Sequence, residues 1–453
     1  MTLVEVLSAL PKDRQLIITA TSGRTVGELL DRVPTLARAF QGRRVAIRLS
    51  DTIAGIEALA AADGRARSVT LLSPSLQDQH LKPLLALADC DLLLCDTPPT
   101  SDLPVDLVYQ ADRLALHATS DPSASAQTET AWHLATSGTT GVPKLVAHSL
   151  ATLSRTAKRG NVESHRMRWG LLYDYTRFAG LQVVLQAIFA GSVLIVPPPT
   201  ATLRDRLAML AAQGCTHLSA TPTLWRNIVM TPGAGSLPLR QVTLGGEIAD
   251  ARILSTLAAT YPGARVTHIY ASTEAGVGFA VKDGKAGFPA SYLDTPPAGL
   301  ALRVVDGRLQ IKNTAVRSAY VGTGDRFGAD DGWIDTGDNV EQSHDRIYFL
   351  GRASGIINVG GNKVHPEEVE RLLLSLPGVR NARVFAKSSP IMGALVAADI
   401  VSTQPQADAV RFRGDIKARL EGQVEPYKIP VILNLVDHIE TTATGKVARG
   451  VTA

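Results

Sequence analysis

The sequence predicts an α/β protein with a large N-terminal domain of layered α/β sheets, a small β subdomain, and a small α+β domain at the C-terminus. Three observations predict this fold class. Short buried apolar segments alternate with helical segments as far as residue 274, which is typical of parallel sheets covered by helices. From about residue 298 strands alternate with turns, and from about residue 351 a compact mixed unit follows.

The first part of the chain supplies strand and helix signals in alternation. Apolar residues recur at helical spacing over residues 25–40, and an Ala-rich helix is expected at about 53–62. Further helices are expected at 203–212 and around Leu224 and Trp225. Buried strands are expected at 44–49, 92–95, 192–196, 217–220, 241–244 and 266–270. Residues 118–130 are rich in Ser, Thr, Pro and Ala, which is typical of a loop.

The second part begins with short strands near Leu302 and Arg308, which predict the β subdomain. A helix is expected at 366–376, because Pro366 and two glutamates stand at its start. The remaining elements are expected as strands at 380–386, 394–401 and 431–436 and a helix at 408–421. We therefore predict two domains, 1–350 and 351–453.

Composition limits the classes of function. The chain has 453 residues, which suggests two to four domains, and its 45% hydrophobic and 19% charged residues are those of a globular protein. The net charge of +4 and the lack of a basic tail predict no nucleic-acid or membrane partner. The N-terminus lacks a signal-peptide pattern, and Cys90, Cys95 and Cys215 match no metal or redox spacing, so we expect a cytoplasmic protein with reduced cysteines.

Residues 134–144 carry the most informative pattern, Leu-Ala-Thr-Ser-Gly-Thr-Thr-Gly-Val-Pro-Lys. Two glycines let backbone N–H groups face one anion, the hydroxyls add donors, and Lys144 adds a positive charge. The run differs from the Walker pattern, because Pro143 occupies the place of its second glycine. The alternative is a plain surface turn. We interpret the run as a polyphosphate-binding segment.

Further motifs follow in a fixed order. They are Tyr270-Ala-Ser-Thr-Glu274, Trp333-Ile-Asp-Thr-Gly-Asp338, Gly351-Arg352 with Gly361, Pro366-Glu-Glu-Val-Glu370, and Thr442-Ala-Thr-Gly-Lys446-Val-Ala-Arg449. With the Gly/Thr run, these motifs make the chain resemble the adenylate-forming superfamily, which holds acyl-CoA synthetases, nonribosomal-peptide adenylation domains and luciferases. The resemblance covers nearly the whole chain. It implies that ATP and Mg²⁺ activate a carboxylic acid and that the C-terminal domain is mobile.

The resemblance also implies roles for individual residues. Catalytic roles fall to Lys446, which bridges the substrate carboxylate and the phosphates, to Glu274, which holds Mg²⁺, and to Lys144, because charge develops on the phosphates as pyrophosphate leaves. Tyr270 stacks on adenine, and Asp338 with Arg352 holds the ribose hydroxyls. The full nucleotide set is Thr136, Ser137, Gly138, Thr139, Thr140, Gly141, Lys144, Gly246, Glu247, Tyr270, Ala271, Ser272, Thr273, Asp338, Arg352 and Lys446.

Domain motion between two half-reactions is implied as well. The hinge falls at Ser354, where most relatives carry Asp or Lys, and Gly361 lies beside the path of a pantetheine thiol. Ala271, Asn358 and Glu440 also depart from the usual residues of the family, and none of these changes removes a charged catalytic group. No role is assigned to His148 or His268.

The substrate is expected to be an acyl or aryl acid without an amino group. Amino-acid-activating relatives place an Asp after the phosphate-binding segment, but the spacing of Asp174 to Ala190 and Gly191 fits the acyl type better. The pocket is expected at Phe178, Gly180, Gly245, Gly246 and Gly276. No carrier-protein sequence follows before Ala453, so the acceptor is expected to be free CoA or a separate carrier protein. The leading expectation is an ATP- and Mg²⁺-dependent carboxylate–CoA ligase. Two alternatives stay open: an acyl-AMP ligase that loads a carrier protein, and a non-catalytic binding protein.

Overall fold

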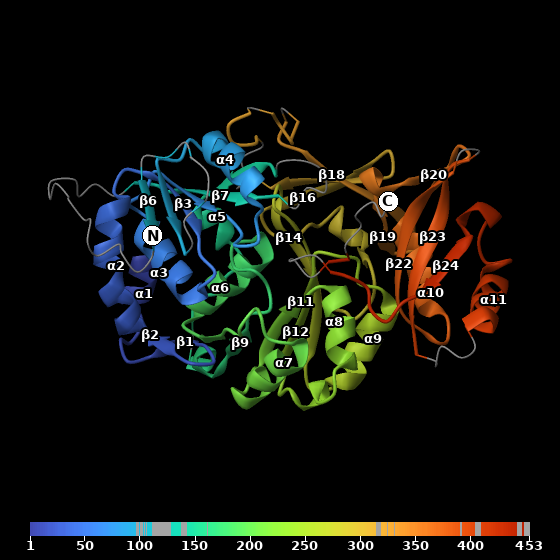
Figure 1. The fold of residues 1–453 in the computed structure, drawn as a ribbon, viewed down its shortest axis with the longest axis horizontal. Coiled ribbons are helices and arrows are strands. Elements are labelled where there is room, and N and C mark those ends of the chain that lie inside the picture. The colour runs from blue at the N-terminus through green and yellow to red at the C-terminus, as the bar shows by residue number, and fades with distance from the viewer. Residues whose placement is uncertain are drawn as a thin grey trace.

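The computed structural model describes residues 1–96, 99, 103, 105, 107–110, 128–136, 143–160, 162–313, 319–323, 325–329, 331–389, 392–403, 409–441 and 446–447. Two α/β sheets form the large N-terminal part, a five-stranded antiparallel sheet follows, and a mixed sheet with helices forms the C-terminal part (Figure 1). The predicted layered α/β fold with a small C-terminal α+β unit is therefore confirmed.

The first sheet has six strands in the order β6-β5-β3-β4-β7-β8. All neighbours are parallel except β7 and β8, which form an antiparallel pair at the edge. The strands are β3 (Arg44–Arg48), β4 (Ser68–Leu71), β5 (Leu92–Cys95), β6 (Leu107–Gln110), β7 (Ala131–Ala135) and β8 (Leu145–His148). The Gly/Thr run lies between β7 and β8 in the sequence.

The second sheet has eight strands in the order β14-β13-β12-β11-β9-β10-β1-β2 and is parallel except at its two edges. The strands are β1 (Gln15–Ile18), β2 (Gly23–Thr25), β9 (Arg168–Gly170), β10 (Val193–Ile195), β11 (His217–Ala220), β12 (Gln241–Gly245), β13 (Arg265–Ser272) and β14 (Gly276–Val281). Because β11, β12 and β13 are parallel, their carboxyl ends meet at one edge, where open α/β sheets bind ligands.

Helices pack against these two sheets. They are α1 (Leu3–Ser8), α2 (Val26–Phe40), α3 (Thr52–Ala62), α4 (Asp78–Leu87), α5 (Leu150–Leu153), α6 (Phe178–Ala190), α7 (Leu203–Ala212), α8 (Pro222–Met230) and α9 (Ala251–Thr260). Both α3 and α6 are buried over almost their whole length, as expected for helices that are apolar on all sides. Side chains of α2, α3 and α6 and of strands from both sheets form a single hydrophobic cluster.

The antiparallel sheet has the order β15-β19-β18-β17-β16 and consists of β15 (Phe288–Pro289), β16 (Leu300–Val305), β17 (Arg308–Asn313), β18 (Ile334–Ser343) and β19 (Arg346–Arg352). The C-terminal sheet consists of β20 (Ile357–Val359), β21 (Asn362–Val364), β22 (Val379–Ser389), β23 (Gly393–Ser402) and β24 (Ile432–Leu435), with α10 (Pro366–Ser375) and α11 (Ala409–Leu420). A separate hydrophobic cluster fills this unit.

The predicted elements agree closely with the observed ones. The helix predicted at 203–212 is α7. The helices predicted at 25–40 and 366–376 differ from α2 and α10 by one residue at one end, and the helix predicted at 408–421 differs from α11 by one residue at each end. Residues 118–127 of the predicted loop lie outside the described residues. The antiparallel sheet ends at Arg352 and the C-terminal sheet begins at Ile357. The division between residues 350 and 351 stays a prediction.

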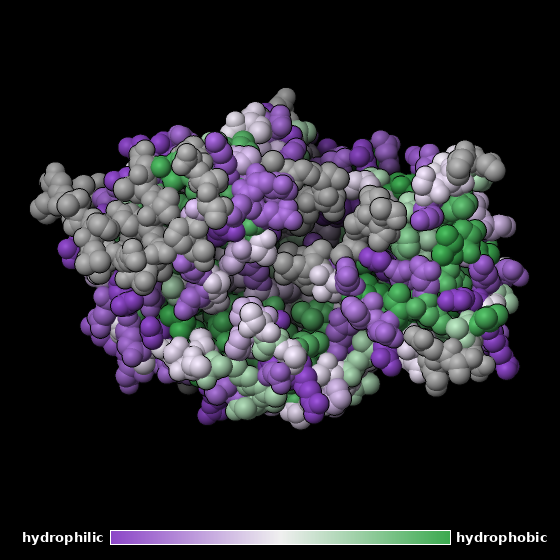
Figure 2. Space-filling model, viewed as in Figure 1, coloured by the Kyte–Doolittle hydropathy of each residue, from purple (hydrophilic) through white to green (hydrophobic). Residues whose placement is uncertain are grey.

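Polar side chains cover most of the face seen in Figure 2, and apolar side chains gather over the C-terminal unit. Within the described ranges, no helix combines the length and the apolar character that crossing a bilayer requires. Cys90, Cys95 and Cys215 are free and buried, and burial raises the pKa of the Cys90 thiol to about 11. These features agree with cysteines that have a structural role.

Candidate active site

The two ends of the Gly/Thr run meet at the end of the β7–β8 pair. Thr136 N donates a hydrogen bond of 2.8 Å to Lys144 O, directly beyond the paired residues Ala135 and Leu145. Lys144 is exposed, and its Nζ lies 4.4 Å from the centroid of the Tyr320 ring. The five residues between these ends that were predicted to bind phosphate lie outside the described residues, namely Ser137, Gly138, Thr139, Thr140 and Gly141.

The motif after β13 lies beside β8. His148, the last residue of β8, has its Nε2 2.8 Å from Thr273 O. The Nε2–H tautomer satisfies this carbonyl, and burial lowers the pKa of His148 to about 4, so the ring is neutral at pH 7. Ser272 Oγ accepts from Ala275 N at 2.9 Å and closes the turn that carries Glu274. The structure thus anchors the backbone on both sides of the predicted Mg²⁺ ligand.

A hydrogen bond and an ion pair link Tyr270, Asp338 and Arg352. The Tyr270 hydroxyl donates to Asp338 Oδ2 at 2.6 Å, and Arg352 Nε lies 3.2 Å from Asp338 Oδ1. Burial, together with the Asp338 charge, raises the pKa of Tyr270 well above its ordinary value. The Tyr270 ring packs almost parallel to Phe279 and Phe349, with centroids 5.2 Å away in each case. The two predicted ribose ligands lie together, and the stacking of Tyr270 on adenine stays a prediction.

Lys446 reaches the large N-terminal part from the far end of the chain. Val447 N donates a hydrogen bond of 2.9 Å to Glu247 Oε1, and Thr223 N, in the first turn of α8, donates one of 2.9 Å to Glu247 Oε2. Gly246, with φ +80°, lies against the lysine, since a Cβ there would be 3.1 Å from Lys446 Cε. Gly246, which directly follows β12, is therefore in contact with the C-terminal segment.

Several charges act on the Lys446 ammonium at this place. Burial lowers its pKa, the positive charge of Arg352 lowers it further, and the carboxylates of Glu247, Asp338 and Glu274 oppose that change. These five groups therefore lie close enough for their charges to act on one another. Four of these residues come from separate predicted motifs and Glu247 comes from a fifth segment, and the structure brings them together.

The residues predicted to line the acid pocket lie around the start of α6 and the ends of β12 and β13. Phe178 is buried, and its ring centroid lies 5.8 Å from that of His148. A Cβ on Gly180 would lie 2.1 Å from Asp174 O, so this glycine is required by close backbone packing. Gly245 ends β12, and Gly276 begins β14 with φ +70°. Their roles in substrate binding stay predictions.

Asp174 is held by the fold. Its Oδ2 accepts a hydrogen bond from Ser73 Oγ at 2.6 Å, and its Oδ1 accepts from Thr176 N at 2.9 Å and from Thr176 Oγ1 at 2.6 Å. Arg177 Nε lies 3.9 Å from Asp174 Oδ2. Three hydrogen bonds and the charge of Arg177 therefore engage a carboxylate with about four acceptor sites, which leaves it little capacity to pair with a substrate ammonium.

The predicted hinge and thiol-path residues lie in the C-terminal part. Ser354 is exposed in a short 3-10 turn, Ala353–Gly355, that separates the antiparallel sheet from the C-terminal sheet. Gly360 and Gly361 have φ of +57° and +89° and form the two-residue turn between β20 and β21. No atom lies within 4 Å of a Cβ built on Gly361, so the turn is open, and a thiol path beside it stays a prediction.

Tyr320 and His148 contact predicted site residues, and sequence reasoning gave neither a role. The Glu274 side chain lies near enough to Tyr320 to raise the pKa of the tyrosine, in addition to burial. For His148, its position four residues after Lys144 was a usable signal. For Tyr320 the sequence offered none, because it belongs to no motif used to define the site.

The donor set fits a magnesium ion held jointly with phosphates. Among the residues that the structure describes, no group of three or more His, Cys, Asp or Glu side chains is arranged to hold a metal. Mg²⁺ in nucleotide sites commonly takes one or two carboxylates and completes its shell with phosphate oxygens and water. Glu274 offers one carboxylate near Tyr320 and acts on the Lys446 ammonium, and its role as a Mg²⁺ ligand stays a prediction.

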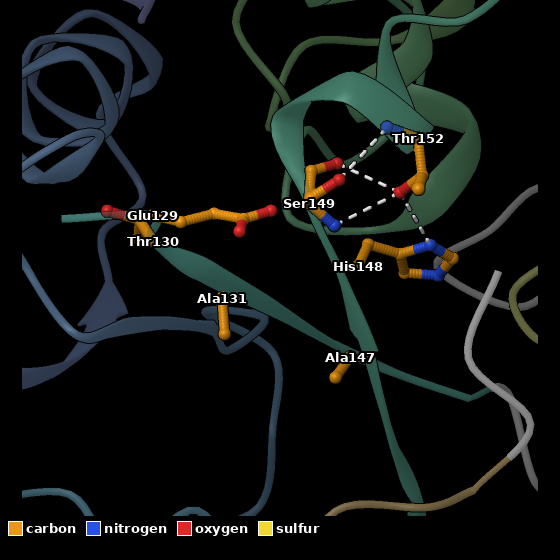
Figure 3. Close-up of a pocket in the computed structure, with 7 residues that line it drawn as sticks. All are labelled: Glu129, Thr130, Ala131, Ala147, His148, Ser149 and Thr152. Carbon is orange, nitrogen blue, oxygen red and sulfur yellow. Dashed lines mark hydrogen bonds between the residues drawn. The ribbon is translucent and has the colours of Figure 1, made fainter. Parts of the chain in front are cut away.

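A separate cavity of about 190 Å³ lies at the other end of the β7–β8 pair (Figure 3). His148, Ser149 and Thr152 form one wall, and Glu129 points across it toward Ser149. Ser149 N donates to Thr152 Oγ1 and Thr152 N donates to Ser149 Oγ, and these two hydrogen bonds cap the start of α5. The cavity is therefore distinct from the place where Lys446 meets Gly246.

Comparison with known families gives two matches. A family described as "AMP-binding enzyme" matches residues 6–316, and one described as "AMP-binding enzyme C-terminal domain" matches residues 368–446. Together they account for most of the chain.

Among curated proteins, the chain is similar to phenyloxazoline synthase MbtB of Mycobacterium tuberculosis (strain CDC 1551 / Oshkosh), with 28% identity over 96% of this chain and 33% of that protein. The chain thus spans about one third of the length of that relative. The medium/long-chain-fatty-acid–acyl-carrier-protein ligase FadD10 of the same strain is 28% identical over 69% of this chain and 64% of that protein.

Among solved structures, the anthranilate CoA ligase AuaEII in complex with anthranoyl-AMP superimposes with a TM-score of 0.83. The alignment covers 99% of this chain and 95% of that one at 17% identity, which shows a shared fold.

Proposed function

Since the chain belongs to the AMP-binding enzymes of the adenylate-forming superfamily, we propose that it is an acyl- or aryl-CoA ligase. In the first half-reaction a carboxylate oxygen attacks the α-phosphorus of ATP, and the bond to the β-phosphate oxygen breaks and releases pyrophosphate. In the second, a thiolate sulfur attacks the acyl carbon, and AMP leaves. Bound Mg²⁺ would offset the phosphate charge, and Glu274 would hold it.

The position of Lys446 carries this proposal. Its segment is bound to Glu247 through the Val447 amide, and its side chain lies against Gly246 among the charges of Asp338 and Glu274. A half-buried ammonium that is fixed before reaction stabilises the negative charge that develops on the carboxylate and phosphates. A surface lysine near a chain end would have none of these contacts. This arrangement supports adenylation chemistry.

Three further residues have proposed roles in nucleotide binding. Asp338 and Arg352 would hold the ribose hydroxyls, since both carboxylate oxygens of Asp338 keep acceptor capacity beyond the contacts described. Lys144 would bind the β- and γ-phosphates. Ser354 is proposed as the hinge about which residues 351–453 turn between the half-reactions, which would expose Gly361 to the incoming thiol.

The substrate is proposed to lack an α-amino group. An amino acid would need a carboxylate to pair with its ammonium, and Asp174, the sequence candidate, has its oxygens bound by Ser73 and Thr176. Breaking those contacts would leave buried hydroxyls without an acceptor, which costs about 1–3 kcal/mol for each group. Asp174 therefore supports a simple acyl or aryl acid as the substrate.

A second candidate for the acceptor is a separate carrier protein. The similarity to FadD10, which is named as an acyl-carrier-protein ligase, supports this candidate. The alignment with FadD10 covers 69% of the chain. Both acceptors present a pantetheine thiol, so the adenylation site would be the same. The two candidate acceptors differ only in the part of the acceptor that would bind outside the thiol path.

A pyrophosphate-exchange screen over aliphatic, aryl and amino acids, with no thiol added, tests the proposal. We expect exchange with aliphatic or aryl acids and its loss in Lys446→Ala. Thioester formation with CoA is then compared with that on carrier proteins; thioester only with a carrier protein would refute the CoA assignment. Absence of exchange with every acid, in folded protein that binds ATP, would favour a non-catalytic binding protein.

A further inference from the structure

Tyr320 lies between two residues of the candidate active site that are distant from it in the sequence. The Lys144 Nζ lies 4.4 Å from the centroid of its ring, on the face. The Glu274 carboxylate lies near enough to the Tyr320 hydroxyl for its charge and hydrogen-bonding capacity to raise the pKa of the tyrosine, in addition to burial. One phenol side chain therefore lies beside both the proposed phosphate-binding cation and the proposed Mg²⁺ ligand.

The backbone fixes this tyrosine relative to β8. Tyr320 forms an isolated antiparallel bridge with Val146, and Val321 N donates to Leu145 O at 2.8 Å. The edge of the ring is covered by Phe327, whose centroid lies 4.8 Å away at an interplanar angle of 59°. Since β8 begins directly after Lys144, the ring has a defined position beside the lysine side chain.

The intervening ring has an electrostatic consequence. A lysine and a glutamate that approach each other freely form an ion pair, which would direct both charges away from the nucleotide. In the described part of the chain, no ion pair joins Lys144 to Glu274. The ring face attracts the ammonium through its quadrupole. Because the face has no lone pair to accept a hydrogen bond, the N–H donors of the lysine stay available to phosphate oxygens. The hydroxyl engages one region of the carboxylate and leaves acceptor sites for a metal.

We propose that Tyr320 is a positioning residue for adenylation, whose ring orients the Lys144 ammonium toward the polyphosphate and whose hydroxyl orients the Glu274 carboxylate toward Mg²⁺. This inference rests on the proposed function, because the roles of Lys144 and Glu274 belong to it. The two contacts come from different parts of one side chain, so two substitutions separate them.

The test uses the full chain and the variants Tyr320→Phe and Tyr320→Leu, with isothermal titration of ATP in the absence of Mg²⁺ and then of Mg²⁺ into the ATP complex. Tyr320→Phe keeps the ring and should bind metal-free ATP as the wild type does, while its Mg²⁺ affinity falls by about ten- to a hundredfold, as for other residues that orient a metal ligand. Tyr320→Leu should show the same Mg²⁺ loss and, in addition, about two- to fivefold weaker binding of metal-free ATP.

Tyr261→Phe is the matched control, because it removes a buried tyrosine hydroxyl bonded to Ala234 O, on the side of the large part away from the nucleotide motifs. It should change neither affinity. Equal loss of metal-free ATP binding in Tyr320→Phe and Tyr320→Leu would overturn the inference, as would wild-type affinities in both. If the wild type binds no ATP, the proposed function fails as well; if it binds ATP and the Tyr320 variants match it, only this inference fails.

Discussion

Glu247→Gln should slow adenylation strongly and leave acyl transfer almost unchanged. The two carboxylate oxygens of Glu247 accept from different backbone amides, Val447 N and Thr223 N, each at 2.9 Å. A glutamine has one acceptor oxygen, so its NH₂ group would face one of these N–H donors. One of the two bonds is therefore lost.

The magnitude follows from the charged acceptor. A hydrogen bond to an ionised group contributes about 1.5–3 kcal/mol, which corresponds to about ten- to 150-fold in an equilibrium. The bond to Val447 holds the C-terminal segment in the orientation that places Lys446 in the site. Its loss should lower the fraction of molecules in that orientation, and the rate of pyrophosphate exchange, by about this factor.

A second consequence concerns pH. The Glu247 charge raises the pKa of Lys446 against the effect of burial, which lowers it. Removing the charge lowers the pKa of Lys446 further, so its proton is lost at lower pH. The alkaline limb of the exchange profile should therefore move toward lower pH in Glu247→Gln.

The assay compares the two half-reactions. Pyrophosphate exchange reports adenylation, and thioester formation from chemically prepared acyl-adenylate reports transfer, in which Lys446 is proposed to lie away from the site. Thr202→Ala is the control, because it removes a helix-cap bond to Asp205 N on α7 and costs about 1 kcal/mol of stability without touching the site. Equal losses in both half-reactions, or unchanged exchange, would refute the positioning of Lys446 by Glu247.

Two further substitutions test other parts of the molecule. Asp338→Asn removes the charge that Arg352 faces at 3.2 Å, and it should raise the KM for ATP by about tenfold or more in exchange assays; an unchanged KM would refute the ribose assignment. Burial lowers the pKa of His217 to about 4 in the folded protein. As pH falls from 6.5 toward 4, the unfolded chain therefore takes up a proton at His217 before the folded protein does. The free energy of unfolding should then drop by up to about 3 kcal/mol over that range, and urea titrations of His217→Asn should show a smaller drop.

Much of the fold could be predicted because its signals are local. The start of α10 is marked by Pro366 and two glutamates, and the apolar composition of α3 marks a helix buried between layers. Strand ends could be placed as well, since the strand expected at 217–220 is β11 and the one expected at 241–244 differs from β12 by one residue. The pairing of β7 with β8, and the antiparallel edges of both sheets, depend on contacts that no local pattern specifies.

The candidate site was predictable one motif at a time, whereas its connections were not. Tyr270 and Asp338 were expected to bind different parts of the nucleotide, and the structure joins them through a hydrogen bond of 2.6 Å across 68 positions of sequence. Glu247 and Val447 are 200 positions apart. Spacing within a motif reflects the geometry of one turn or strand, and it contains no information on which side chains another element brings to it.

Lys446 shows what the tertiary structure adds to such motifs. Burial and the charge of Arg352 both lower its pKa, and a lysine that lost its proton could not bridge a carboxylate and a phosphate. Glu247, Asp338 and Glu274 act in the opposite direction and favour the protonated ammonium. The carboxylates assigned to the nucleotide, its ribose and the metal therefore have a second effect in common, which is to keep the lysine charged where it meets them. A substitution at any of the three should alter the alkaline limb of adenylation as well as the affinity for its own ligand.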